Sequence, residues 1–238
     1  MAGLYLHVPF CRQKCHYCDF FSASPTGDQL QSWHQLLERN LQLVAGQQCP
    51  ALDTIFFGGG TPSLLTPAQI DSILSCCRGL FHLAPDVEIS LEANPGTLTA
   101  RTLEGYQAAG INRLSLGIQS FDNKNLQLLG RRHSAEEAAE SFMLARDIGF
   151  TNISVDLIFA LPGQKAGDLA QEIEKLLVLS PDHIGIYGLS VENDTLLEEM
   201  VTKGQVSEVD EETYAQSYLL LNHLLCGAGY EHYEISNF

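Results

Sequence analysis

Two kinds of apolar pattern alternate along this chain. Short, nearly continuous apolar runs rich in β-branched and aromatic residues predict six strands, at residues 4–10, 54–60, 87–93, 113–120, 152–162 and 183–191. Longer amphipathic stretches lie between and after them and predict helices, the best at residues 28–44, 67–80, 99–109, 134–148, 166–179 and 211–226. A strand followed by a helix, repeated in this way, is typical of βα units around a parallel sheet.

Local start and stop signals agree with this pattern. The pair Thr66-Pro67 and the motif Ser134-x-x-Glu137 are typical of helix starts, and Gly110 and Gly149 stand where helices end. No linker, charge block or low-complexity stretch interrupts the sequence, so we expect one domain over residues 1–238.

Six βα units are fewer than the eight of a closed barrel, which typically needs about 250 residues. An open or partial barrel therefore fits the pattern better. In a barrel and in an open α/β sheet alike, chemistry belongs at the carboxyl ends of the strands. Most of the polar residues and glycines considered below stand at those ends of the predicted strands.

The charge of the chain restricts its partners. Lys and Arg number 13 against 29 Asp and Glu, a formal net charge of −16, which disfavours binding to nucleic acid or loose adsorption to an anionic membrane. No apolar run approaches the roughly 20 residues that span a bilayer, although peripheral membrane contact stays open. The N-terminus shows no basic segment followed by a signal-type apolar stretch, so we expect a cytoplasmic protein.

Seven cysteines are present, an odd number that a reducing cytoplasm would keep as thiols unless a metal holds them. Four are scattered, and we interpret them as small core or surface residues because free cysteine packs as a small hydrophobe: Cys49, Cys76, Cys77 and Cys226. The other three fall within eight positions: Cys11, Cys15 and Cys18.

The spacing of these three cysteines, CxxxCxxC, favours an iron-sulfur cluster over zinc. A closed zinc site wants four ligands, commonly from two cysteine pairs, and the chain has no second pair. His16 is a candidate fourth ligand, but its neighbour Cys15 would strain the chelate. A four-iron cluster held by three thiolates leaves one iron free to bind another group. A structural metal protein with zinc on this loop remains the alternative from another class.

This loop, with Tyr17 before its last cysteine and a strand before it, resembles the radical S-adenosylmethionine (radical SAM) superfamily. More narrowly, the chain resembles the HemW haem-chaperone family, which is related to anaerobic coproporphyrinogen III dehydrogenase. The segments that carry this resemblance are LYLHVPFCRQKCHYCDFFS, FFGGGTPSLL, LEANPGTLT, RLSLGIQSFD and VDLIFALPGQ. It runs from Tyr5 to the last residue and implies a partial (β/α)6 TIM-like barrel of the radical SAM type.

The resemblance also implies cofactors and partners. Cys11, Cys15 and Cys18 would hold a [4Fe-4S] cluster whose free iron binds the amino and carboxylate groups of S-adenosylmethionine. Haem would be cargo for haem-accepting proteins, and an electron donor would reduce the cluster. Nine residues would line the cofactor site: Tyr5, Tyr17, Gly59, Gly60, Thr61, Glu92, Gln119, Arg132 and Asp156. We interpret His7, on the first strand, as a satisfied interior histidine, and Trp33 as part of the core or its flank.

Two departures from the family patterns bear on function. The dehydrogenase carries a further cysteine two places after the third ligand, where this chain has Phe20, which favours the chaperone over the dehydrogenase. HemW proteins continue past the equivalent of YEISNF into a His-Asn-x-x-Tyr-Trp motif and a small C-terminal domain. This sequence stops at Phe238 and its sole tryptophan is Trp33, so we expect that domain to be absent and haem binding to be weak.

Overall fold

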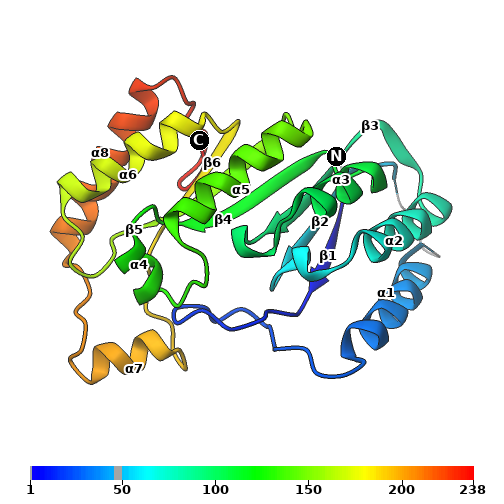
Figure 1. Cartoon of the computed structure of the whole chain (residues 1–238), viewed down its shortest axis with the longest axis horizontal. Helices are drawn as coiled ribbons and strands as arrows, with labels where there is room; N and C mark the ends of the chain where they lie inside the picture. The colour runs from blue at the N-terminus through cyan, green and yellow to red at the C-terminus, as the bar shows by residue number, and fades with distance from the viewer. Residues whose placement is uncertain (1, 46–49) are drawn as a thin grey trace. The chain divides into compact units, whose positions relative to one another are not determined.

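A computed structural model of the chain describes residues 2–45 and 50–238, so the interpretation of Cys49 lies outside the described residues. Six strands form one sheet in the order β1-β2-β3-β4-β5-β6: β1 (Gly3–Val8), β2 (Leu52–Gly59), β3 (Leu83–Ala93), β4 (Arg113–Gln119), β5 (Ile153–Phe159) and β6 (His183–Gly188). The helices are α1 (Gln29–Ala45), α2 (Pro67–Leu80), α3 (Ala100–Ala109), α4 (Asn123–Leu128), α5 (Ala135–Ile148), α6 (Ala166–Leu179), α7 (Leu196–Thr202) and α8 (Glu211–Gly227), as Figure 1 shows.

The residues cluster into two compact units. Unit 1 comprises residues 1–14, 20–115 and 144–151, and unit 2 comprises residues 15–19, 116–143 and 152–238. The expectation of a single domain over the whole chain stays a prediction.

In unit 1 the strands β1, β2 and β3 are parallel neighbours. Their register pairs Tyr5 with Phe56, Val8 with Gly59 and Phe57 with Leu91. Residues such as Ile55 and Phe57 are fully buried. Helix α2 packs beside both α1 and α3 (Figure 1). The apolar core thus lies between these strands and helices.

The hydroxyl of Tyr106 on α3 ties that helix to the turn after β2. The side chain is fully buried, and its hydroxyl donates to the carbonyls of Ser63 and Leu65 at 3.1 and 2.7 Å. This turn contains the 3-10 helix η1 (Pro62–Leu64). A second 3-10 helix, η2 (Pro95–Thr97), follows β3. The carboxyl ends of β2 and β3 therefore both lead into short, tightly bonded turns.

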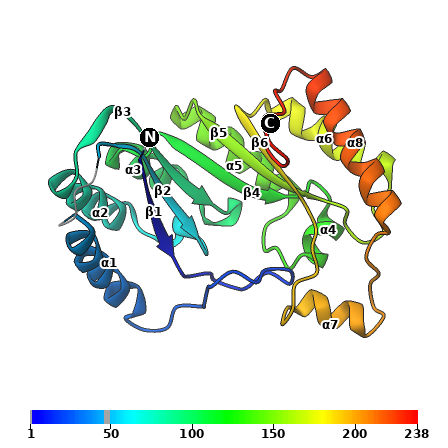
Figure 2. The ribbon, with the colours of Figure 1, turned by 180° about the vertical axis from the view of Figure 1, so that it is seen from behind.

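In unit 2 the strands β5 and β6 are parallel, with Val155 opposite Ile184. The helices α6 and α8 lie side by side (Figures 1 and 2). The C-terminal segment pairs in antiparallel fashion with β6, where Ile184 and Phe238 exchange two backbone hydrogen bonds of 2.9 Å. Its last residues therefore cover the outer edge of β6.

The predicted helix boundaries are confirmed closely. The hydroxyl of Thr66 accepts from the Gln69 amide at 3.3 Å at the start of α2, and the Ser134 hydroxyl accepts from the Glu137 amide at 3.2 Å before α5. Gly110 has φ 112° and Gly149 has φ 108°, the left-handed backbone that suits glycine after a helix. The short helices α4 and α7, of six and seven residues, were not predicted, because neither is long enough for an amphipathic repeat.

Candidate functional site

Cys11 follows directly from β1 and is held by backbone hydrogen bonds. The chain turns at Pro9, which cannot donate to a strand ladder. The Cys11 amide donates to the Ala23 carbonyl at 3.0 Å, and the Ala23 amide donates to the Pro9 carbonyl at 2.9 Å. Cys11 therefore has a fixed backbone although it stands in a loop.

Thr61 lies against this cysteine because the end of β2 continues along the chain that leaves β1. The Gly60 amide donates to the Val8 carbonyl at 2.8 Å, and the Thr61 amide donates to the Phe10 carbonyl at 2.7 Å. The Thr61 side chain is only 4% exposed, and its hydroxyl donates to Cys11 Sγ at 3.5 Å. The sequence Gly-Gly-Thr thus delivers a hydrogen-bond donor to a predicted metal ligand.

The glycines of this turn allow close packing within unit 1. A Cβ at Gly60 would lie 2.6 Å from the Phe10 carbonyl oxygen, and one at Gly59 would lie 2.6 Å from the ring of His7, where φ is also +113°. The Gly59 amide donates to Glu92 Oε2 at 3.1 Å. Glu92 of β3 therefore reaches the end of β2, and a bare backbone is required there.

Tyr5 and His7 lie on the same face of β1. Tyr5 stacks on Phe56 with ring centroids 6.1 Å apart, and its hydroxyl lies 3.2 Å from His7 Nδ1. His7 Nε2 lies 3.0 Å from the Phe21 carbonyl oxygen, so both ring nitrogens of this half-buried histidine have partners. Burial, and secondly the charge of Glu92, raise the pKa of Tyr5, so its phenol stays protonated at neutral pH.

The segment of residues 15–19 belongs to unit 2 and is anchored there through His16. The His16 amide donates to the Leu129 carbonyl at 3.0 Å, its Nδ1 lies 2.8 Å from the Leu128 carbonyl oxygen, and the Leu197 amide donates to its carbonyl at 2.8 Å. Through these bonds His16 holds the segment of residues 15–19 in place within unit 2. The Cys18 amide donates to the Cys15 carbonyl at 3.3 Å, which closes a turn between these two thiols.

Arg131 contacts this turn through its guanidinium. Its Nη1 donates to Cys15 Sγ at 3.4 Å, and its Nη2 donates to the Gly117 carbonyl at 2.6 Å. Tyr17 packs on the apolar cluster of Leu129, Ile158 and Leu161. Burial raises the pKa of Tyr17 well above its ordinary value, an effect that the positive charge of Arg131 partly offsets.

The remaining predicted residues of unit 2 lie at the end of β4, in the middle of β5 and in a loop. Gln119 ends β4 with φ +71°, a left-handed conformation that non-glycine residues adopt at a cost and that occurs often at functional sites. Asp156 of β5 stands opposite Gly185 of β6, where a Cβ would lie 2.7 Å from Asp156 Oδ1. Arg132 is exposed, beside the half-buried Arg131.

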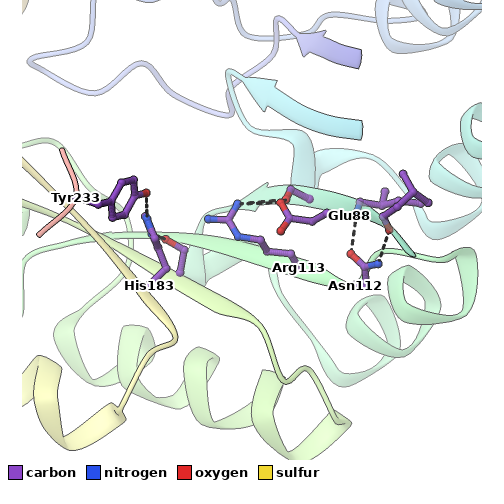
Figure 3. A network of polar contacts seen from close by, with 9 residues as sticks. Glu88, Asn112, Arg113, His183 and Tyr233 are labelled. Atoms are coloured by element: carbon purple, nitrogen blue, oxygen red, sulfur yellow. Dashed lines mark hydrogen bonds and ion pairs between the residues drawn. The ribbon is translucent and has the colours of Figure 1, made fainter. Parts of the chain in front are cut away.

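Other polar networks lie at the amino ends of strands, away from these residues in each unit (Figure 3). In unit 1, Arg113 Nη1 donates to the Ser90 hydroxyl at 3.2 Å and lies 3.8 Å from Glu88 Oε1. In unit 2, His183 Nε2 lies 2.7 Å from the Tyr233 hydroxyl and Nδ1 lies 2.8 Å from that of Ser154. Ser154 is 1% exposed and Tyr233 is 61% exposed, so this network runs from the interior of unit 2 to its surface.

The donors around the cysteines fit an iron-sulfur cluster. Among the described residues, no three His, Cys, Asp or Glu side chains are already grouped as a metal site. The chemistry of the donor set is nevertheless suitable, because three thiols are soft ligands and hydrogen bonds to ligand sulfurs are typical of clusters. Cys11 and Cys15 already accept such bonds from Thr61 and Arg131.

Sequence reasoning missed two residues that contact this set. Arg131 touches Cys15, whereas the residue named from the sequence was Arg132. Asn94 stands within the quoted segment LEANPGTLT, and its Nδ2 donates to the Thr61 hydroxyl at 3.1 Å. For the arginines, no pattern distinguishes two adjacent residues in a loop. For Asn94, the signal was its position directly after the predicted strand that carries Glu92.

Comparison with solved structures confirms the predicted fold class. The coproporphyrinogen III oxidase HemN from Escherichia coli, described as a radical SAM enzyme, is similar to this chain with a TM-score of 0.90 and 25% sequence identity. The match covers 100% of this chain and 55% of that one. The six-stranded α/β sheet therefore has the architecture of a partial (β/α)6 barrel of the radical SAM type.

Sequence comparisons confirm the resemblance to HemW. The chain is 37% identical to "Heme chaperone HemW" of Bacillus subtilis, and the match covers 100% of this chain and 63% of the relative. It is 38% identical to "Radical S-adenosyl methionine domain-containing protein 1, mitochondrial" of Bos taurus, covering 100% of this chain and 54% of the relative. The chain thus spans little more than half the length of these curated relatives.

The family model described as "Radical SAM superfamily" matches residues 5–176, which include the three-cysteine loop and the predicted cofactor residues Thr61, Glu92, Gln119 and Asp156. The chain belongs to the radical SAM superfamily.

Proposed function

We propose that this chain binds one [4Fe-4S] cluster through Cys11, Cys15 and Cys18, and S-adenosylmethionine beside it. The observation that carries this proposal is the CxxxCxxC loop directly after β1, with two of its sulfurs accepting hydrogen bonds from Thr61 and Arg131. Family membership supports it, because the superfamily is named for S-adenosylmethionine.

A bound cluster with one iron free of cysteine would take up the amino and carboxylate groups of S-adenosylmethionine and supply an electron to it. The chain would hold and orient this cofactor. The carboxylates of Glu92 and Asp156 accept from its ammonium group or ribose hydroxyls, and the Gln119 amide can both donate and accept. A guanidinium at position 131 or 132 suits its carboxylate, because arginine presents a planar fork of donors.

We further propose that the chain is a haem chaperone of the HemW type, which receives haem and delivers it to haem-accepting proteins in the cytoplasm. The named HemW relatives support this role. So does Phe20, a 64% exposed side chain that stands where the related dehydrogenase has a further cysteine. No helix among the described residues could cross a membrane. Besides haem-accepting proteins, the second proposed partner is an electron donor that reduces the cluster.

Anaerobic reconstitution tests the cluster proposal. The wild-type chain should carry about four irons and four sulfides, and S-adenosylmethionine should alter the electron paramagnetic resonance spectrum of the reduced cluster. Replacing Cys11, Cys15 and Cys18 together by Ala should abolish the signal. Replacing Cys76 and Cys77 by Ala is the matched control and should leave it. Stoichiometric zinc without a brown chromophore would contradict the proposal and favour the structural metal protein.

A second candidate function is the oxygen-independent oxidation of coproporphyrinogen III. The structural similarity to HemN favours it. The reconstituted chain, supplied with reductant, S-adenosylmethionine and coproporphyrinogen III, should give no oxidised product if it is a chaperone. Multiple turnovers in this assay would replace the chaperone proposal by the enzymatic one.

A further inference from the structure

The Thr61 hydroxyl has two neighbours, and their chemistry fixes the direction in which it points. Asn94 Nδ2 donates to this oxygen at 3.1 Å, and Cys11 Sγ lies 3.5 Å from it. A hydroxyl has one hydrogen and two lone pairs. The side-chain amide of Asn94 donates to one lone pair of the Thr61 oxygen. The single hydrogen of the Thr61 hydroxyl is directed to Cys11 Sγ.

Asn94 is itself held from both sides of its backbone. Its backbone amide donates to the Ser63 hydroxyl at 3.2 Å, and the Thr97 hydroxyl donates to its backbone carbonyl at 2.7 Å. The Ser63 and Thr97 hydroxyls are 2.6 Å apart, and Ser63 is 4% exposed. The turn after β2 and the turn after β3 are thus joined by the hydrogen-bonded hydroxyls of Ser63 and Thr97, which hold the backbone of Asn94.

Hydrogen bonds to ligand sulfurs help to set the reduction potential of an iron-sulfur cluster, since they withdraw electron density from the thiolate. Replacing a group that orients a metal ligand typically costs roughly 10- to 100-fold in metal affinity or activity. Loss of one such bond makes the sulfur a stronger electron donor and the cluster harder to reduce.

We propose that Asn94 is a positioning residue that acts through Thr61: it directs the Thr61 hydroxyl onto Cys11 Sγ and thereby raises the reduction potential of the cluster. This inference rests on the proposed function, because it needs a cluster on Cys11. Asn94 Nδ2 donates to the Thr61 hydroxyl, so the inference requires its effect on the cluster to pass through the hydroxyl of residue 61.

The test is a spectroelectrochemical titration of reconstituted variants of the 238-residue chain. Thr61→Val and Asn94→Ala should each shift the midpoint potential to more negative values, and Thr61→Ser should restore the wild-type value. In a Thr61→Val background, adding Asn94→Ala should cause no further shift. Asn112→Ala is the matched control, because Asn112 holds the middle of β3, away from its carboxyl end, through the Ile89 amide and the Val87 carbonyl at 2.7 and 2.9 Å (Figure 3). Its midpoint potential should equal that of the wild type.

Several results would overturn the inference. One is an unchanged potential in Thr61→Val. A second is a shift in midpoint potential for Asn94→Ala that is equally large in the Thr61→Val background and in the wild-type background. A third is an equal shift in the control Asn112→Ala. If Asn94→Ala does not retain iron, Asn94→Asp keeps the shape and removes the donor, and a wild-type potential in that variant counts against the inference. A wild-type chain without a cluster would refute the proposed function as well, whereas unchanged potentials in loaded variants refute only this inference.

Discussion

Arg131 and Arg132 are chemically identical neighbours in surroundings that differ. Arg131 donates to Cys15 Sγ and to the Gly117 carbonyl, whereas Arg132 is exposed. We predict that Arg131→Ala weakens S-adenosylmethionine binding by roughly tenfold or more, because a charged hydrogen bond is typically worth about 1.5–3 kcal/mol. Arg132→Ala should change the dissociation constant less than twofold. Equilibrium titration of the reconstituted variants measures both constants.

The variants Arg131→Ala and Arg132→Ala also test the prediction from the sequence that Arg132 is a cofactor residue. A large loss of affinity in Arg132→Ala with little effect of Arg131→Ala would support Arg132, the residue predicted from the sequence, as the cofactor ligand. Arg131→Lys adds a further check, since lysine keeps the charge but cannot bridge a sulfur and a carbonyl with a planar fork. It should bind the cofactor less tightly than the wild type.

His133, two residues further on, links stability to pH. It is 6% exposed, its Nε2 lies 3.0 Å from the Ile118 carbonyl oxygen, and burial, with the charge of Arg131, lowers its pKa from 6.5 to about 4. Between these two values the unfolded chain binds a proton that the folded chain does not. Stability from this group is therefore full above pH 6.5 and is lost as the pH falls toward 4, by at most about 3 kcal/mol.

We predict that His133→Gln, which can still donate to Ile118 but does not titrate, flattens the fall in melting temperature between pH 6.5 and 4. Thermal unfolding of both proteins across this range gives the comparison, and the difference between them removes the contribution of other titrating groups. Parallel curves for the variant and the wild type would show that His133 is protonated as readily in the folded chain as in the unfolded one.

At the scale of elements, the turn from β4 to α4 is fixed by a carboxylate of α6. Glu172 is 4% exposed and accepts from the Ser120 hydroxyl, the Phe121 amide and Asn125 Nδ2 at 2.8, 2.9 and 3.0 Å. Burial raises the pKa of this carboxyl, and the hydrogen bonds from Phe121 and Ser120 offset part of that rise. Since Gln119 directly precedes Ser120, Glu172 fixes the backbone next to a predicted cofactor residue.

We predict that Glu172→Ala lowers the free energy of unfolding by about 3 kcal/mol, because several buried donors lose their acceptor. The nearby Glu174 of α6 is exposed, and Glu174→Ala should change the free energy of unfolding by less than about 0.5 kcal/mol. Urea denaturation of the two variants provides the measurement. Equal effects would mean that solvent or another group satisfies the donors at Ser120 and Phe121.

Elements with a strong local signal could be predicted from the sequence. The helix over residues 67–80 was predicted with its observed limits, Pro67–Leu80, because a threonine cap precedes it and its buried residues recur at helical spacing. The long β3 was predicted to begin at residue 87 but begins at Leu83, since pairing of Leu52 with Leu83 extends it and no local pattern reveals that pairing. The start of β3 is therefore set by its pairing with β2 and not by the local sequence pattern.

At the scale of the whole molecule, the motifs could be found in the sequence but their mutual contacts could not. The cysteine spacing and the family segments predicted the radical SAM fold, which the comparisons confirm. The donation from Thr61 to Cys11 joins residues 50 positions apart, and that from Arg131 to Cys15 joins residues 116 positions apart. Such contacts depend on strand register, which a single sequence does not specify.

The last prediction concerns haem. These 238 residues contain one tryptophan, Trp33, which packs edge-on against Phe10 with ring centroids 6.1 Å apart, and no His-Asn-x-x-Tyr-Trp motif. His7, His16 and His133 all have hydrogen-bond partners within the fold, so an iron ligand from them would break existing contacts. We therefore predict that this chain binds haem at least tenfold more weakly than the Bacillus subtilis HemW, of whose length it spans 63%.

Parallel haem titrations, followed by the absorbance of the bound haem, measure the two dissociation constants. Both proteins should be loaded with their clusters first, so that a difference cannot come from unequal reconstitution. Replacing His223, which lies on α8 outside the predicted site, by Ala serves as the control for adventitious binding to a surface histidine. Tight, stoichiometric binding by this chain, unchanged in His223→Ala, would show that the radical SAM fold itself holds the haem. The chaperone activity would then have to be assigned to residues 1–238 and not to the additional length of the relatives.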